Sequence, residues 1–279
     1  MGIFNLFKKK KDNQPKTQSV EENTIPQVES TPITESPVKE ESSTAEKEPY
    51  YGNLQHTQFL LEMLQIPHEK RDQEWERQFL QYVLTASFKA GTPQIIEGPD
   101  GFPYFQLFLP EPNKEFQCFV LEHMIDDFLL KEGFGVVINP QATGADWVFS
   151  YGDLSNMKLN NQFYGASFNP FKANAETEVI TEEEQVMIGQ PVETILPSYT
   201  RAQISKLLKL NGIEHPKVLL MIRPKHGDQH DLVFNVTPHQ FANEQQFQQL
   251  MRTISWYLPR HYTFMGMEES TMAQGFEPL

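Results

Sequence analysis

Apolar residues recur every three or four positions in five parts of the chain, and this spacing predicts helices. The clearest helix covers residues 69–90, where Trp75, Phe79 and Val83 share one face and Arg71 lies on the opposite, solvated face. Asn243 is a typical N-cap for the last helix. The five predicted helices cover residues 57–64, 69–90, 121–131, 198 or 199 to 210, and 243–257.

Short β-prone runs between these helices predict strands. The turn sequence Gly98-Pro99-Asp100-Gly101 joins the first two strands into a hairpin. Residues 162–184 read as a long connection between two halves. The predicted strands cover residues 94–96, 104–109, 116–119, 135–138, 146–150, 185–188, 218–222, 232–236 and 262–265.

Helices and strands in this order predict an α+β fold, with antiparallel or mixed sheets packed against helices. From residue 185 the order is β-α-β-β-α-β, which is typical of a ferredoxin-like unit. The strand at 218–222 is apolar on both faces, which indicates that its sheet is covered twice. We expect residues 94–184 to bury the second face at least in part.

The composition changes at residue 50. Residues 12–49 hold nine acidic residues, three lysines, five prolines and no aromatic residue. Such a segment cannot bury enough apolar surface to offset the entropy of ordering, so we expect disorder. The predicted organisation is a disordered acidic tail with a basic amphipathic N-terminus at 1–49, an N-terminal α+β domain at 50–184 and a C-terminal α+β domain at 185–279.

The first eleven residues combine a short apolar face with a basic flank, a pattern that favours weak contact with an anionic membrane surface. The residues that would make this contact are Ile3, Phe4, Phe7, Lys8, Lys9, Lys10 and Lys11. The alternative is an ordinary N-terminus with solubilising lysines. No stretch is apolar enough to cross a membrane, so we expect a cytoplasmic protein, peripheral at the inner membrane face if the contact forms.

The net charge of the 279-residue chain is −14, with 37 acidic and 23 basic residues. Residues 50–279 contain 28 of the acidic and 16 of the basic residues, so the folded part carries −12. This charge disfavours nucleic-acid binding, because phosphate attraction dominates such binding. It favours a basic protein partner.

The chain lacks the common catalytic and nucleotide-binding motifs, and its single cysteine, Cys118, excludes a disulfide within the chain. Three groups of residues remain open. A hairpin with His226, Asp228, His230 and Asp231 is either a metal site or a polar turn. His123 with Asp126 and Asp127 is either an acid–base pair or a solvated helix face. Cys118 near His123 is either a nucleophile or a small buried residue. The second interpretation is favoured each time, so no catalytic residue, metal or cofactor is predicted.

Residues 143–153 concentrate aromatic and acidic side chains, as protein contact sites do. The contact candidates are Asp146, Trp147, Phe149, Tyr151 and Asp153. In the alternative interpretation, Trp147 and Phe149 belong to a core strand and Asp153 caps the next helix. Because large aromatic residues in strands are mostly buried, this alternative is favoured.

Several short segments resemble the SseB (enhanced serine sensitivity) family of bacterial proteins. They are Gly133-Phe134-Gly135-Val136-Val137-Ile138-Asn139-Pro140, Ile188-Gly189-Gln190-Pro191, Leu196-Pro197, Lys217-Val218-Leu219-Leu220-Met221 and Leu258-Pro259. The resemblance covers residues 94–275 and is clearest in the C-terminal part. It implies a fold rather than an activity, since the family offers no catalytic signature to carry over.

The resulting expectation is a non-enzymatic bacterial protein-interaction module, an acidic α+β platform on a flexible tether. One alternative is a toxin-antagonist (immunity-like) protein, whose acidic surface masks a basic site. Another is a hydrolase that uses histidine and carboxylates. A pocket that brings His226, His230 or His123 together with a carboxylate of perturbed pKa would favour the hydrolase, and a scatter of these residues over convex surface would disfavour it.

Overall fold

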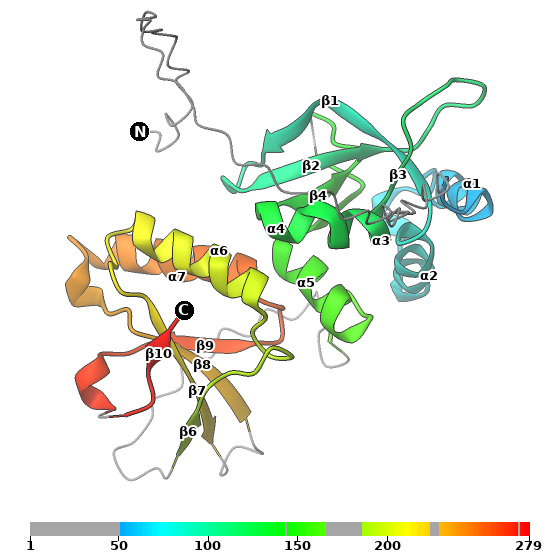
Figure 1. Ribbon diagram of the computed structural model, residues 1–279. Helices are drawn as coiled ribbons and strands as arrows, with labels where there is room; N and C mark the ends of the chain where they lie inside the picture. Colours follow the sequence, from blue (N-terminus) through cyan, green and yellow to red (C-terminus); the bar gives the residue numbers. More distant parts are fainter. Residues whose placement is uncertain (1–50, 143, 166–185, 224–228, 273) are drawn as a thin grey trace, which may run out of the picture. The chain divides into compact units, whose positions relative to one another are not determined.

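The computed structural model describes residues 51–279 except 143, 166–185, 224–228 and 273. The predicted disorder at 12–49 and the predicted membrane contacts at 1–11 lie outside the described residues, as does the predicted domain boundary at 184. The described residues from 51 onward belong to one compact unit. Its described residues have the predicted α+β fold (Figure 1).

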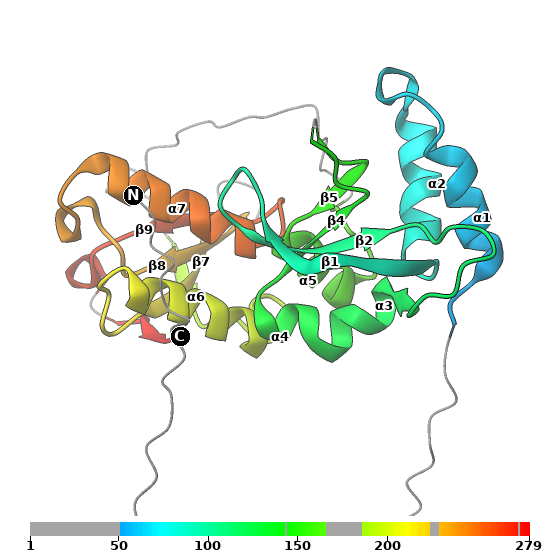
Figure 2. The same ribbon diagram turned by 90° about the horizontal axis from the view of Figure 1, so that it is seen from above.

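Two helices, α1 (Leu54–Met63) and α2 (Gln73–Val83), pack against each other before the first sheet. Figure 2 shows them side by side at one end of that sheet. Asn53 and Asp72 cap their N-termini by accepting backbone N–H groups. A single 3₁₀ turn, His68–Lys70, lies between them.

The first sheet has the strand order β3-β1-β2-β4-β5. β1 and β2 form the predicted antiparallel hairpin, β4 is parallel to β2, and β5 is antiparallel to β4. β5 is therefore the last described strand on its side. The bounds are β1 Ser87–Glu97, β2 Pro103–Phe108, β3 Phe119–Val120, β4 Gly135–Ile138 and β5 Trp147–Phe149.

One continuous helical stretch joins β3 to β4. It consists of α3 (Leu121–Met124), a π-helical turn (Ile125–Leu129) and α4 (Leu130–Glu132). Gly133 ends it with a φ of 81°, a left-handed conformation that favours glycine. After β5, α5 (Tyr151–Asn160) begins at a capping box made by Ser150 and Asp153.

The predicted helix over residues 69–90 is too long at both ends. α2 begins at Gln73, and the chain becomes strand β1 at Ser87. Ser87 and Phe88 pair with β3 and are fully buried, so tertiary pairing overrides the helical pattern there. The residues that follow the predicted helix, Gly91-Thr92-Pro93, lie in an irregularity of β1 where the register with β2 shifts.

The second sheet follows the predicted chain order β-α-β-β-α-β. Its elements are β6 (Met187–Gly189), α6 (Ser198–Leu210), β7 (Lys217–Arg223), β8 (Gln229–Phe234), α7 (Glu244–Tyr257), β9 (Thr263–Gly266) and a final short β10 (Glu277–Pro278). The strand order is β10-β7-β8-β9, with β6 also paired to β7.

This strand order corrects the ferredoxin-like prediction. A split β-α-β unit places a strand between its two parallel strands, whereas here β8 and β9 are parallel and adjacent. β6 and β7, which α6 connects, are adjacent and antiparallel. The chain order could be derived from local patterns, but the pairing depends on which strands meet in space.

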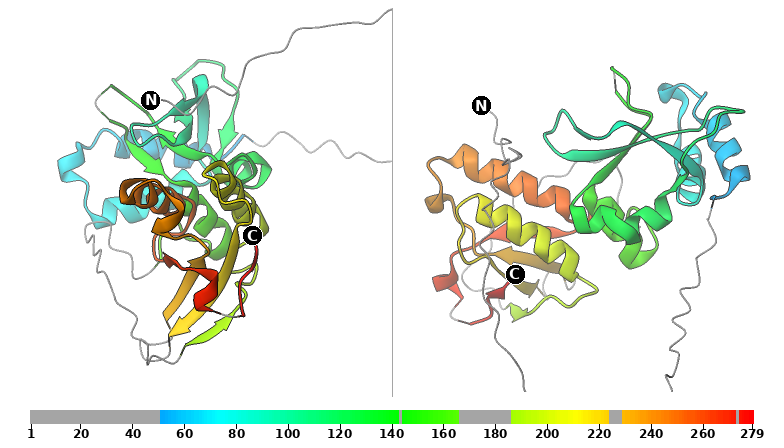
Figure 3. Two further views of the ribbon diagram at one scale, coloured as in Figure 1. Left: turned by 90° about the vertical axis from the view of Figure 1, so that its left-hand side faces the viewer. Right: turned by 45° about the horizontal axis from the view of Figure 1, so that its top comes forward.

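Opposite faces of the second sheet have different covers. α6 and α7 lie side by side over one face (Figure 3), where Ile204, Leu208, Leu250 and Ile254 pack on β7 and β8. The other face presents Leu219, Met221 and Val233, all fully buried. Their described cover is Val186, Met265, Met267, Met272 and Phe276.

Double coverage of the strand at 218–222 is thus confirmed. The described cover consists of Val186 and C-terminal residues, and none of it comes from the described residues between 94 and 165. The expected contribution of residues 166–184 lies outside the described residues. β9 is a strand of this sheet, so the residues that follow it in the chain start beside this face and can fold over it.

Both halves of the described fold contain a helix-strand-strand-helix-strand series, which the short strand β3 interrupts in the first half. The series is α2, β1, β2, the α3–α4 stretch and β4 in the first half, and α6, β7, β8, α7 and β9 in the second. In each, an antiparallel hairpin precedes a helix that returns to a strand parallel to the second hairpin strand. α5 packs on α7 and α4 on α6. Among the described helices, none has the length and apolar character needed to cross a bilayer.

Candidate functional site

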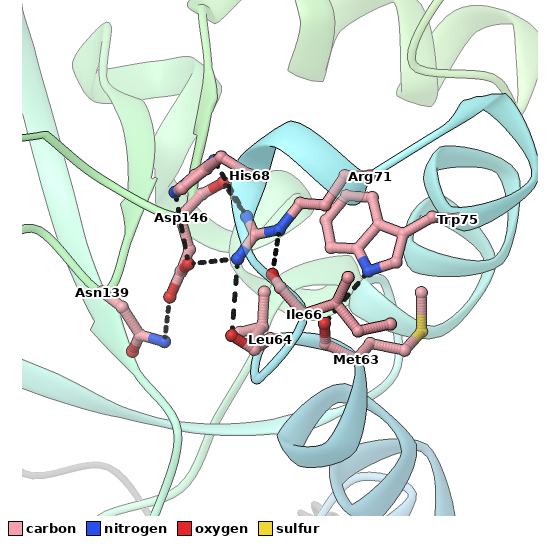
Figure 4. A network of polar contacts seen from close by, with 8 residues as sticks. All are labelled: Met63, Leu64, Ile66, His68, Arg71, Trp75, Asn139 and Asp146. Carbon is pink, nitrogen blue, oxygen red and sulfur yellow. Dashed lines mark hydrogen bonds and ion pairs between the residues drawn. The ribbon is translucent and has the colours of Figure 1, made fainter.

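Arg71, between the 3₁₀ turn and α2, connects the α1–α2 pair to the first sheet (Figure 4). Its Nε donates to the carbonyl oxygen of Ile66 at 2.9 Å and its Nη2 to that of Leu64 at 3.4 Å. The same guanidinium group binds Asp146 through the backbone oxygen at 3.2 Å and Oδ1 at 2.8 Å. The Arg71 side chain is 8% exposed, so its predicted solvated position on the helix is wrong.

Asp146 is held from a second side by Asn139, whose Nδ2 donates to its Oδ2 at 2.9 Å. Asn139 has a left-handed φ of 48°, and its Oδ1 accepts the backbone N–H of Leu109. Asn139 therefore links the end of β4 to Asp146 before β5 and to Leu109 after β2. His68 approaches the other carboxylate oxygen of Asp146 at 3.8 Å, and its own side chain is exposed.

An aromatic wall continues from Arg71. The guanidinium carbon lies 4.6 Å from the ring centroid of Trp75, and the Trp75 Nε1 donates to the carbonyl oxygen of Met63 at 3.0 Å. Trp147 of β5 packs 5.9 Å from Trp75 and 4.9 Å from Phe79, centroid to centroid. The Trp147 Nε1 donates to the hydroxyl of Tyr164 at 3.2 Å.

A second arginine also contacts this group of aromatic side chains. Arg260, which follows α7, donates through Nε and Nη2 to the two carboxylate oxygens of Asp153, each at 2.7 Å. Its guanidinium carbon also lies 4.7 Å from the ring centroid of Tyr164. Asp153 is fully buried and accepts the backbone N–H of Ser150 as well. Burial raises the pKa of Asp153, while Arg260 and Ser150 oppose the rise.

These residues surround a cleft of about 410 Å³, which we call the aromatic cleft. Glu76 lines it from α2 and is half-buried. Burial raises the pKa of the Glu76 carboxyl, and the nearby Arg260 opposes this in part. The lining residues are His68, Arg71, Asp72, Trp75, Glu76, Ala145, Asp146, Trp147, Val148, Tyr164 and Arg260.

A second cleft of about 510 Å³ meets the first at Ala145 and Val148. We call it the apolar cleft, because Ile96, Pro99, Val137 and Pro140 contribute to its lining. Glu97 and Asp100 also line it, and Asp100 accepts a hydrogen bond from the hydroxyl of Tyr104 at 2.6 Å.

The predicted contact residues separate into two groups. Asp146 and Trp147 line the aromatic cleft. Phe149, Tyr151 and Asp153 are fully buried and offer no surface to a partner, so we remove them from the contact set. Phe149 lies in the core of β5, and Asp153 belongs to the capping box of α5. This part of the structure follows the alternative interpretation of the segment.

The other predicted groups do not form a site among the described residues. His226 and Asp228 lie outside the described residues, His230 is exposed, and the buried Asp231 accepts from Nε of Arg223 at 2.7 Å. His123 is exposed, and the Sγ of Cys118 donates to the carbonyl oxygen of Tyr51. Within the described ranges, no group of three or more metal-ligating side chains comes together.

The sequence patterns did not predict that five of the residues lining the aromatic cleft belong to one site. These residues are Arg71, Trp75, Glu76, Tyr164 and Arg260. Arg71 and Asp146 are 75 positions apart, and Arg260 and Asp153 are 107 apart. No local spacing could have joined them. The carboxylate of Asp146 accepts hydrogen bonds from Arg71 and Asn139, so this carboxylate is poorly suited to act as a general base.

The comparisons with known proteins add no family. No protein-family model, curated protein or solved structure matches the chain.

Proposed function

We propose that this chain is a non-enzymatic bacterial protein-interaction module, similar to the SseB family, that binds a basic segment of a partner protein in the aromatic cleft. The supporting observation is the composition of the cleft wall. Trp147 and Tyr164 stand beside the carboxylates of Asp72, Glu76 and Asp146. Aromatic faces and carboxylates together attract lysine and arginine side chains.

The charge balance of the cleft supports a cationic ligand. Arg71 and Arg260 are ion-paired with Asp146 and Asp153, which offsets their charges. Glu76 remains in a partly desolvated position that raises its pKa. An incoming ammonium or guanidinium group would stabilise the ionised form of Glu76. The net charge of −12 on residues 50–279 would also accelerate the approach of a basic partner.

In this proposal the protein is cytoplasmic, and residues 12–49 tether the folded part to an N-terminus that contacts anionic lipid. The four lysines Lys8–Lys11 and the adjacent apolar face support that contact. Co-sedimentation with phosphatidylserine vesicles should exceed co-sedimentation with phosphatidylcholine vesicles at low salt. Equal binding to both vesicles would contradict the membrane part of the proposal.

Peptides that bind the immobilised full chain can be selected from a random library, and this selection tests which peptides the aromatic cleft binds. We expect enrichment of peptides with lysine or arginine, and affinities about tenfold lower for Glu76→Gln and for Trp147→Ala, the loss of one cation–aromatic or ionic contact. Glu74→Gln is the matched control, because Glu74 lies on the same helix, is exposed and pairs with Arg77.

Selected peptides that bind both cleft variants as tightly as the wild type would refute the proposed site. Selection of acidic or uncharged peptides would refute the proposed ligand class. Thermal melting of each variant checks that the change in affinity does not come from unfolding.

A further inference from the structure

The strand β5 separates the two clefts and stands at the end of its sheet. The register pairs Val136 with Phe149, Val137 with Val148 and Ile138 with Trp147. Trp147 and Phe149 therefore point to one face of the sheet and Val148 to the other, because side chains alternate along a strand. Trp147 lines the aromatic cleft. Val137, which pairs with Val148 on the neighbouring strand, lines the apolar cleft.

The backbone of β5 has one position that is suited to a further strand. The carbonyl oxygen of Phe149 lies against Gly135 of β4, so the backbone groups of Phe149 face inward. In an antiparallel pair this direction alternates, which turns the N–H and C=O of Val148 to the outer edge. The Val148 residue is 42% exposed, and no described strand pairs with that edge.

The two neighbouring positions on the outer edge are already occupied. The carbonyl oxygen of Asp146 accepts from Arg71, and the N–H of Ser150 donates to Asp153. The edge therefore offers one hydrogen-bonded residue pair, centred on Val148, and is closed at both ends. Such an edge limits uncontrolled strand pairing while leaving a defined docking position.

We propose that the partner's basic segment binds as an antiparallel strand on β5, with the order basic–apolar–basic. This inference rests on the proposed function and specifies how the segment binds at the same site. The central residue would exchange two hydrogen bonds with Val148, and its side chain would enter the apolar cleft. The side chains on either side would point to the other face, beside Trp147, Glu76 and Asp146.

Charge and polarity favour this occupant over a second copy of the chain. A second β5 would bring another Trp147 and Asp146 to an edge that is already acidic. An extended segment with two cations instead complements Asp72 and Glu76. The apolar lining by Ile96, Val137 and Pro140 suits a central valine, isoleucine or leucine.

The experiment uses the tightest peptide selected on the full chain and its backbone-methylated forms. N-methylation of the central residue removes the N–H that would donate to Val148. We expect it to weaken binding about tenfold, as for one lost hydrogen bond. N-methylation of either neighbouring residue is the matched control, because those N–H groups point away from β5, and it should change the affinity less than twofold.

The outcomes separate the two proposals. Peptides that depend on Trp147 and Glu76 but tolerate central N-methylation would leave the proposed function standing and overturn the strand addition. A selection without any cleft-dependent peptide would overturn both. A dimer of the free full chain that Val148→Pro abolishes would also overturn the inference, because a second copy would then occupy β5.

Discussion

Arg71 joins three segments that are distant in the sequence. Its guanidinium group binds carbonyl oxygens at the end of α1, a carboxylate in the loop before β5 and the face of Trp75 on α2. The side chains of Arg71 and Asp146 are 8% and 12% exposed, so little solvent screening weakens the ion pair. A lysine could not reproduce this fork of donors, since it carries a single ammonium group.

Replacement of Arg71 by alanine should destabilise the fold by about 3 kcal/mol, because it leaves the mostly buried Asp146 without its cation. Urea unfolding, followed by tryptophan fluorescence, measures the change. Arg77→Ala, on the following helix α2, is the control, and the loss of its exposed side chain should leave the unfolding midpoint nearly unchanged. Similar midpoints for both variants would contradict a structural role for Arg71.

At the scale of elements, the junction of α5 with the residues after α7 requires glycine. A Cβ atom on Gly152 would lie 1.9 Å from the carbonyl oxygen of Leu258, which is a backbone atom and cannot swing away. The Arg260–Asp153 pair lies in the same junction. Trp256 of α7 adds a ring stacked on Phe102 at 4.4 Å and donates from Nε1 to the hydroxyl of Tyr104.

Gly152→Ala should therefore destabilise the protein by about 2 kcal/mol or more, through a backbone shift at this junction. Gly189→Ala is the matched control, because a Cβ there meets no atom within 4 Å. Differential scanning calorimetry should show a lower melting temperature for Gly152→Ala alone. An unchanged melting temperature would mean that the two segments do not approach as closely as described.

Elements with a strong local signal could be predicted, and those that depend on distant pairing could not. The sequence predicted β4 over 135–138 with the observed bounds, and α6 to within one residue at its start, because an apolar run and a helical face identify them locally. It placed Ser87 and Phe88 in a helix, although β3 holds them as a strand. In the site, Asp146 and Trp147 stood out by composition, whereas Arg71 and Arg260 acquire their roles only through contacts across the fold.

At the scale of the whole molecule, the C-terminal residues complete the second sheet. Met267, Met272 and Phe276 pack on Leu219, Met221 and Val233, side chains that would otherwise face water. β10 pairs with β7, and the N–H of Leu279 donates to the carbonyl oxygen of Pro216 at 3.0 Å.

Glu269 is a polar anchor of this C-terminal cover. Its Oε2 pairs with Nζ of Lys217 at 2.6 Å, and its Oε1 accepts from Nδ2 of Asn235 at 2.8 Å. The hydrogen bond from Lys217, followed by that from Asn235, lowers the pKa of Glu269 below its usual value. The carboxylate form is thus favoured in the folded protein.

Acid should loosen the C-terminal cover through Glu269. Because its folded pKa is lowered, the stabilisation is present above the ordinary glutamate pKa and is lost as the pH falls through the lowered value. Hydrogen exchange of the Glu277 and Leu279 amides, normalised to intrinsic rates, should show protection at pH 6 that declines below about pH 4, near the ordinary glutamate pKa. Glu269→Gln should reduce the protection at pH 6 and remove most of its pH dependence. Glu268→Gln, an exposed neighbour, is the control; if it behaved like Glu269→Gln, the anchor would not be specific to Glu269.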